Sequence, residues 1–138
     1  MKLLNSVVAT NVFIILLTVM AGTCWGLNKR QLQEYQKVVS EMNKSLPMMT
    51  SKEIQLTRVY LQDSTVVYVL KSVLFDKRHI DPRDLENNKK PASARGLCSA
   101  PDSLNMIKQG LIYKYVFYDM YDTYVHEYTV SAKDCGFR

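Results

Sequence analysis

The two histidines are the first residues to test for chemistry. His79 stands in the segment DKRHIDP, just ahead of several acidic residues and Arg83, and His126 stands alone near the C-terminal end. The spacing around His79 matches no known metal-binding loop, and neither histidine lies in an HExxH motif. The chain also has no GxSxG and no phosphate-binding glycine loop. We therefore expect no catalytic, cofactor-binding or metal-ligating residue, and a protein that is not an enzyme.

Tyrosine is the other residue type that could act chemically, by stacking on sugars or bases. Six of the nine tyrosines lie between Tyr113 and Tyr128, in a stretch without glycine or proline. A stacking platform would combine aromatic rings with amide and acidic side chains. On the outer face of the strands expected here, the polar residues that carry no hydroxyl are Lys114, His126 and Glu127. The composition therefore favours a core or a protein interface over a small-molecule substrate.

The N-terminus has the pattern of a secretory signal peptide. Met1 and Lys2 precede an apolar run over residues 12–21, and cleavage is predicted after Ala21 or after Gly26. We take residues 1–26 as the signal peptide and residues 27–138 as one domain of the periplasm. Export makes nucleic acid an unexpected partner.

Two alternatives to cleavage stay open. Residues 7–26 have about the length of a membrane helix, which would leave the protein membrane-anchored, but Asn11 interrupts them. Lipid attachment at Cys24 is the second alternative, and Ala21 and Thr23 fit its residue preferences badly.

Export also determines how the cysteines are interpreted. With Cys24 in the signal, Cys98 and Cys135 are the two that remain. Two cysteines in an oxidising compartment have one possible pairing, so we predict a Cys98–Cys135 disulfide. Two buried free thiols are the alternative.

The charge of the chain is moderately basic, with a net value of +5. Basic residues gather in the middle of the chain: Lys77, Arg78, Lys89, Lys90 and Arg95. Such a cluster could contact anionic lipid, peptidoglycan or an acidic protein face. A solvated loop is the favoured interpretation.

The elements that position these residues follow from periodicity. Apolar residues recur at three- and four-residue spacing, at Leu32, Tyr35, Val38, Val39, Met42 and Leu46. This predicts an amphipathic helix that ends near Leu46, since Pro47 follows. Residues 53–63 and 64–75 are rich in β-branched and aromatic residues and predict two strands joined by a short turn.

The rest of the chain predicts helices and then a hairpin. We expect a short helix over residues 82–88, a break near Pro91 and a firmer helix over 101–109. Strands over 111–118 and 123–131 follow, with 119–122 as the turn. The register expected for them pairs Lys114 with Glu127, Phe117 with Tyr124 and Tyr113 with Tyr128. The fold class is therefore α+β: an N-terminal helix on a four-stranded antiparallel sheet, with short helices between strands 2 and 3.

Several short motifs resemble a loose group of small exported bacterial α+β proteins with a cystatin-like helix on a sheet. The motifs are NKSLP, GLCSAPDSLNMIKQGLIYKYVFYD and SAKDC, and the match is carried by Cys98, Ser99, Pro101, Gly110 and Cys135. Within the group, the chain is similar to a homodimeric periplasmic protein associated with type IV secretion and intracellular replication. It departs from the group at residues 119–122, where relatives often carry a glycine.

The resemblance implies a non-enzymatic periplasmic protein that acts through protein–protein interaction. It would support an envelope machine such as a type IV secretion system, through contact with another envelope protein. The alternative is a periplasmic inhibitor of a lysozyme or a protease.

We also predict a homodimer. One helix and a small sheet leave apolar surface uncovered, including residues 48–49, and a symmetric pair is the commonest way to cover it. The interface would bury at least about 1,000 Å². Its candidate residues are Tyr118, Tyr124, Tyr128, Tyr35 and Val39.

Overall fold

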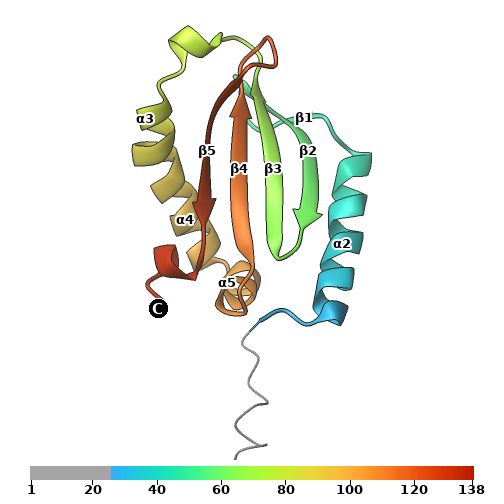
Figure 1. Cartoon of the computed structure of the whole chain (residues 1–138). Helices are drawn as coiled ribbons and strands as arrows, with labels where there is room; N and C mark the ends of the chain where they lie inside the picture. Colours follow the sequence, from blue (N-terminus) through green and yellow to red (C-terminus); the bar gives the residue numbers. More distant parts are fainter. Residues whose placement is uncertain (1–25) are drawn as a thin grey trace, which may run out of the picture.

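The computed structural model describes residues 26–138 (Figure 1). The predicted apolar run of the signal, the cleavage position after Ala21 and Cys24 lie outside the described residues. Within the described part, no helix is long and apolar enough to cross a membrane. The single periplasmic domain over 27–138 stays a prediction.

Helix α2 (Lys29–Lys44) is the predicted N-terminal helix. Asn28 caps it, because its side-chain oxygen accepts from the backbone N–H of Gln31 at 2.9 Å and the Gln31 side chain accepts from the N–H of Asn28 at 3.0 Å. The helix ends at Lys44 with Ser45 as its C-cap, close to the predicted stop before Pro47. Its apolar side packs on the sheet, and Val39 is buried there.

Five strands form one sheet, and their order in the sheet is their order in the chain. They are β1 (Met48–Met49), β2 (Ile54–Gln62), β3 (Thr65–Ser72), β4 (Ile112–Tyr118) and β5 (Tyr124–Val130). The predicted β2–β3 and β4–β5 hairpins are both present. The α+β class is confirmed, but the four-stranded antiparallel sheet is wrong: the sheet has five strands and β3 pairs with β4 in parallel.

The crossover between β3 and β4 explains the parallel pair. It contains η1 (Lys77–His79), α3 (Pro82–Asp84), η2 (Leu85–Lys89), α4 (Lys90–Ser99) and α5 (Pro101–Lys108). These segments run back along the sheet, as Figure 1 shows, and return the chain to the end where β3 began. A strand that starts there must run parallel to β3. Sequence analysis expected the helices but not this consequence.

The predicted break near Pro91 is also wrong. Backbone angles stay helical from α3 through η2 into α4. A proline ring inside a helix collides with the carbonyl four residues earlier, here Asn87. The π-helical turn directly before Pro91 is wider than an α-turn and accommodates the ring.

The last hairpin differs from the predicted register. Tyr113 faces Val130 rather than Tyr128, and Tyr128 faces Tyr115 instead. Lys114 still reaches Glu127 diagonally, with Nζ 2.7 Å from Oε1. The turn needs no glycine because Asp122 adopts the left-handed φ of 63°, which aspartate tolerates better than most residues.

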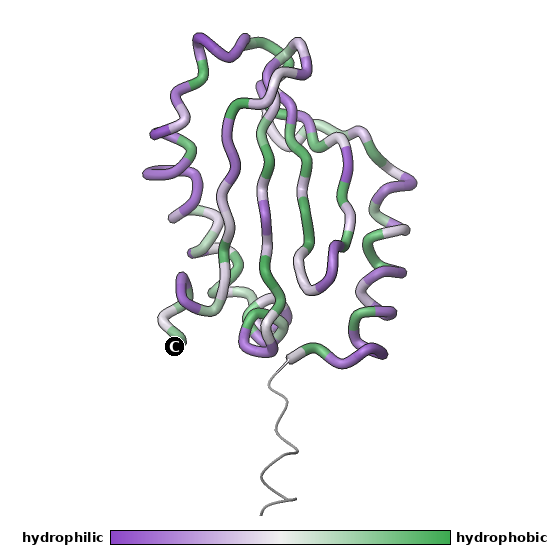
Figure 2. The backbone as a smooth tube through the Cα atoms, viewed as in Figure 1, coloured by the Kyte–Doolittle hydropathy of each residue, from purple (hydrophilic) through white to green (hydrophobic). Residues whose placement is uncertain are grey.

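The helices cover one face of the sheet. The core joins helix residues to sheet residues of that face, such as Val66, Tyr113 and Val130. Val67 and Val116 point to the opposite face, where Lys114 and Glu127 lie beside them. Figure 2 shows apolar and polar residues alternating along the strands, and mostly polar residues along the first part of the crossover.

Candidate functional site

Three connections meet at one end of the sheet, the upper end in Figure 1. They are the β1–β2 turn, the segment that follows β3 and the β4–β5 turn. Two backbone hydrogen bonds join them: Val73 N–H donates to the Glu53 carbonyl at 2.9 Å, and Met120 N–H donates to the Phe75 carbonyl at 3.0 Å. The connections therefore form one surface.

This surface collects exposed apolar side chains. Those that lie here are Met48, Met49, Leu74, Phe75, Tyr121 and Tyr124, which we call the sheet-end surface. Elsewhere in residues 26–138, the exposed large apolar side chains are Val38 on α2 and Phe137 near the C-terminus. Exposed apolar side chains that gather at one end of a small protein are typical of an interaction site.

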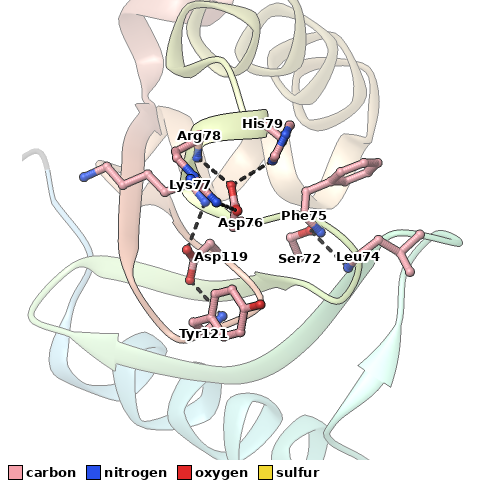
Figure 3. Close-up of polar contacts among 9 residues, drawn as sticks. All are labelled: Ser72, Leu74, Phe75, Asp76, Lys77, Arg78, His79, Asp119 and Tyr121. Atoms are coloured by element: carbon pink, nitrogen blue, oxygen red, sulfur yellow. Dashed lines mark hydrogen bonds and ion pairs between the residues drawn. The ribbon is translucent and has the colours of Figure 1, made fainter.

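The side chain of Asp119 joins two of these connections (Figure 3). Its side chain is buried and accepts three backbone hydrogen bonds, from the N–H groups of Lys77 at 2.9 Å, Tyr121 at 2.9 Å and Thr123 at 2.8 Å. Lys77 follows β3, whereas Tyr121 and Thr123 belong to the β4–β5 turn. One carboxylate therefore fixes two connections relative to each other.

Ser72 and Asp76 fix the segment between β3 and η1. The Ser72 hydroxyl oxygen accepts from the N–H of Leu74 at 3.4 Å and of Phe75 at 3.0 Å. Asp76 caps η1 and contacts the Arg78 guanidinium at 2.8 Å and His79 Nδ1 at 2.8 Å (Figure 3). The exposed side chains of Leu74 and Phe75 thus stand on a backbone with defined hydrogen bonds.

Hydrogen-bond donors keep two acids of this surface ionised. The Arg78 guanidinium and the other donors to Asp76 hold the pKa of that carboxyl well below its ordinary value. Burial alone would raise the pKa of Asp119, but the backbone N–H groups of Thr123, Lys77 and Tyr121 outweigh it, and the pKa is lowered. Both groups are ionised at neutral pH and can only accept hydrogen bonds.

We expect acid to release the sheet-end surface. The folded pKa of Asp119 lies below its unfolded value of about 3.9, so its stabilisation is complete above that value and is lost as pH falls through the folded pKa. In ¹H–¹⁵N spectra from pH 7 to pH 2, the amides of Lys77, Tyr121 and Thr123 should shift together, with one midpoint below about pH 4. Asp119→Asn should abolish this titration. Midpoints that differ among the three amides, or lie above pH 4, would contradict the assignment.

The tyrosines form an aromatic row on the covered face of the sheet. The hydroxyls of Tyr35 and Tyr113 share a hydrogen bond with an O···O distance of 2.9 Å. Tyr68 stacks on Tyr113 and on Tyr115, with ring centroids 6.3 Å and 5.3 Å apart, and Tyr115 lies 5.1 Å from Tyr128. The row thus joins α2 to β5 across the middle of the sheet.

Burial disfavours ionisation of Tyr35, Tyr68, Tyr115 and Tyr128. It raises the pKa of Tyr68 to about 12 and also raises those of Tyr35, Tyr115 and Tyr128. Tyr128 further shares a hydrogen bond with Ser93 of α4, with an O···O distance of 3.0 Å. The tyrosines therefore act as packing groups and hydrogen-bond partners.

The predicted interface residues do not lie on one surface. Val39 and Tyr128 are buried in the core, so neither is available to a second copy. Tyr35 is half-buried against that core. Tyr118 and Tyr124 come together at the opposite side, with ring centroids 6.2 Å apart. Because strand side chains alternate between faces, Tyr118 lies on the opposite face of the sheet from Tyr128. The homodimer stays a prediction.

The predicted disulfide is present in the structure. Cys98 at the end of α4 bonds to Cys135 in η3 (Ala132–Cys135), with an S–S distance of 1.99 Å.

The two histidines pair with carboxylates in different places, His79 with Asp76 and His126 Nε2 with Glu86 at 3.1 Å. Among residues 26–138, no group of three metal-ligating side chains could hold an ion.

Most of the sheet-end surface was not predicted from the sequence. Residues 48–49 were expected to be exposed and Asp119 to start a turn, but Leu74, Phe75 and Tyr121 had no predicted role. One local signal was available, because aspartate often accepts hydrogen bonds from the backbone two residues ahead and so starts a turn. The pairing of that turn with the segment after β3 has no local signal.

Comparison with known proteins was made on this fold. The sequence matches no protein-family model and no curated protein. Among solved structures, a protein of Pseudomonas aeruginosa described as secreted matches with a TM-score of 0.65 and 15% identity, over 80% of this chain and 99% of its own. The pilotin EpsS of the Vibrio vulnificus type 2 secretion system matches with a TM-score of 0.61 and 15% identity, over 78% of this chain and 94% of its own.

A second pilotin extends the likeness. AspS, from the type II secretion system of Vibrio cholerae, matches with a TM-score of 0.53 and 14% identity, over 72% of this chain and 87% of its own. None of these three neighbours is named as a cystatin-like protein. At such identities, the likeness shows that this chain shares its fold with a protein described as secreted and with two secretion-system pilotins.

Proposed function

We propose that this protein is an exported, non-enzymatic accessory protein of an envelope secretion machine, and that it docks a partner protein on the sheet-end surface. The observation that carries the proposal is the display of Leu74, Phe75 and Tyr121 on connections fixed by the buried Asp119. Apolar side chains exposed on a fixed backbone lose little conformational freedom on binding, which favours affinity.

The shared fold supports the choice of a secretion machine. Two of the solved structures that resemble this chain are pilotins of type II systems, and each is matched over most of its length. A type II machine is therefore the first candidate. Type IV secretion linked to intracellular replication, which the sequence resemblance implies, is the second. Deletion strains scored for export through each machine separate the two candidates.

Location in the periplasm belongs to the same proposal. The signal pattern over residues 1–26 and the Cys98–Cys135 disulfide both support an oxidising compartment outside the cytoplasm. A lipid at Cys24 or an uncleaved signal would tether the same domain to a membrane, and intact-mass measurement of the exported protein distinguishes the three forms.

We expect Leu74→Glu to impair partner binding and secretion. The side chain is 56% exposed, so the change should leave the fold intact while placing a charge where an apolar contact forms. Loss of a central interface contact typically weakens affinity by about tenfold or more. A benzophenone amino acid in place of Tyr121 allows photo-crosslinking in whole cells, which measures contact with the partner. Export of a secreted reporter measures the function in secretion.

Val38→Glu is the matched control, because Val38 is 54% exposed but lies on α2. Both variants should unfold within about 0.5 kcal/mol of the wild type. Equal crosslinking and equal secretion for the two variants would refute the role of the sheet-end surface in partner binding. If secretion is unchanged and the deletion strain instead becomes sensitive to lysozyme or protease, the inhibitor function replaces the accessory one.

A further inference from the structure

A cavity of about 210 Å³ opens beside the sheet-end surface. Its apolar lining comes from Ile54 of β2, Phe75 after β3, Ile80 after η1, Leu85 of η2 and Phe117 of β4. Leu85 and Phe117 are core residues, so the floor of the cavity is the core itself. Phe75, which is partly exposed, links the cavity to the sheet-end surface.

The volume limits what the cavity can hold. Sites for metabolites and cofactors usually measure about 300–1,000 Å³, which exceeds this cavity. An apolar cavity of about 150 Å³ is large enough to bind benzene. The space therefore suits one large side chain, aromatic or aliphatic.

The mouth carries acidic charge. The acidic side chains that line the cavity are those of Glu53, Asp81 and Asp84. The basic ones are Lys89 and His79, and His79 pairs with Asp76. Asp81 is bonded to Arg83 on its own segment, and Asp84 accepts from Asn88. The acidic mouth contrasts with the chain as a whole, whose net charge is +5. A cationic group beside the inserted side chain would complement this local charge.

We propose that the cavity receives one large apolar side chain from a partner peptide whose neighbouring residues are basic. The proposal rests on the accessory function above and specifies the chemistry of its partner. Leu74 and Tyr121 would contact the partner around the anchor, while Glu53 and Asp84 would face its cations. This arrangement combines an apolar anchor in a pocket with charges at the rim, as in many protein interfaces.

Blocked tripeptides test the proposal on the purified protein. Acetyl-Lys-Phe-Lys-amide should shift the ¹H–¹⁵N signals of residues around the cavity, with a dissociation constant at least about tenfold lower than that of Lys-Ala-Lys, since the phenyl ring is buried. Glu-Phe-Glu should bind several-fold more weakly than Lys-Phe-Lys, and added salt should reduce this difference.

Two variants locate the binding. Ile80→Phe fills the cavity and should abolish the advantage of Lys-Phe-Lys over Lys-Ala-Lys. Glu53→Lys changes only the exposed mouth and should abolish the advantage of Lys-Phe-Lys over Glu-Phe-Glu, whereas Glu34→Lys on α2 should leave it unchanged. Shifts confined to another face, equal binding of all three peptides, or insensitivity to Glu53→Lys would each overturn the proposal.

The outcomes also separate this inference from the proposed function. If the peptide binds in the cavity but Leu74→Glu leaves secretion intact, the assignment of the cavity as a peptide site is supported and the accessory function in secretion is refuted. If Leu74→Glu abolishes secretion while no peptide binds, the accessory function stands and the cavity assignment is overturned.

Discussion

Replacing Cys98 with serine should lower the free energy of unfolding by about 3 to 4 kcal/mol, because the disulfide closes a long loop in the unfolded chain. The two cysteines are 37 positions apart in sequence, and the loop between them contains α5, β4 and β5. A loss of this size is a large part of the stability of a small domain. The structure explains why the bond can form: η3 packs against α4 and α5, and both cysteines are partly buried there.

Urea unfolding checks this prediction, with Cys98→Ser, Cys135→Ser and the double variant measured beside the wild type. The double variant and the reduced wild type should agree, since both lack the same bond. Their dependence on urea should also be steeper, because an unfolded chain without the crosslink exposes more surface. An unchanged midpoint after reduction would show that the bond does not stabilise the fold.

Asn43→Ala should destabilise the protein by about 2 to 4 kcal/mol, since two buried backbone groups lose their partner. The Asn43 side chain accepts from Val59 N–H at 3.0 Å and donates to the Val59 carbonyl. Val59 is buried, and the short strand β1 pairs with β2 only at Leu56 and Gln55. Asn43 therefore takes the place of a neighbouring strand at the β2 edge and docks α2 on it.

Gln36→Ala on the exposed side of α2 is the matched control and should change the free energy of unfolding by less than about 0.5 kcal/mol. In the wild type, the amide nitrogen of Asn43 donates to the carbonyls of Val39 and Val59. Asn43→Asp keeps the acceptor oxygen but replaces this donor with a carboxylate oxygen, which the two carbonyls repel. It should destabilise at least as much as the alanine variant at neutral pH and less in mild acid, where the carboxyl can donate. Equal effects of Asn43→Ala and Gln36→Ala would refute the docking role.

Local interactions made parts of this protein predictable. Helix α2 followed from apolar spacing and from Pro47, because both act within one or two turns of the chain. The β2–β3 pair followed from two β-rich segments around a short turn at Asp63, which adopts a left-handed φ of 53°. The disulfide followed from counting, since the predicted signal peptide contains Cys24 and leaves Cys98 and Cys135 as the one pair.

Tertiary structure decided the rest, because it depends on contacts between residues far apart in the chain. The parallel pairing of β3 and β4 depends on the end of the sheet to which the crossover helices return the chain. No local sequence pattern predicts that end. Tyr128 and Tyr118 look alike in sequence, but the register and the helices bury one and leave the other half-exposed. The sheet-end surface arises because Asp119 accepts from Lys77, 42 positions earlier, so the long-range fold alone brings these residues together.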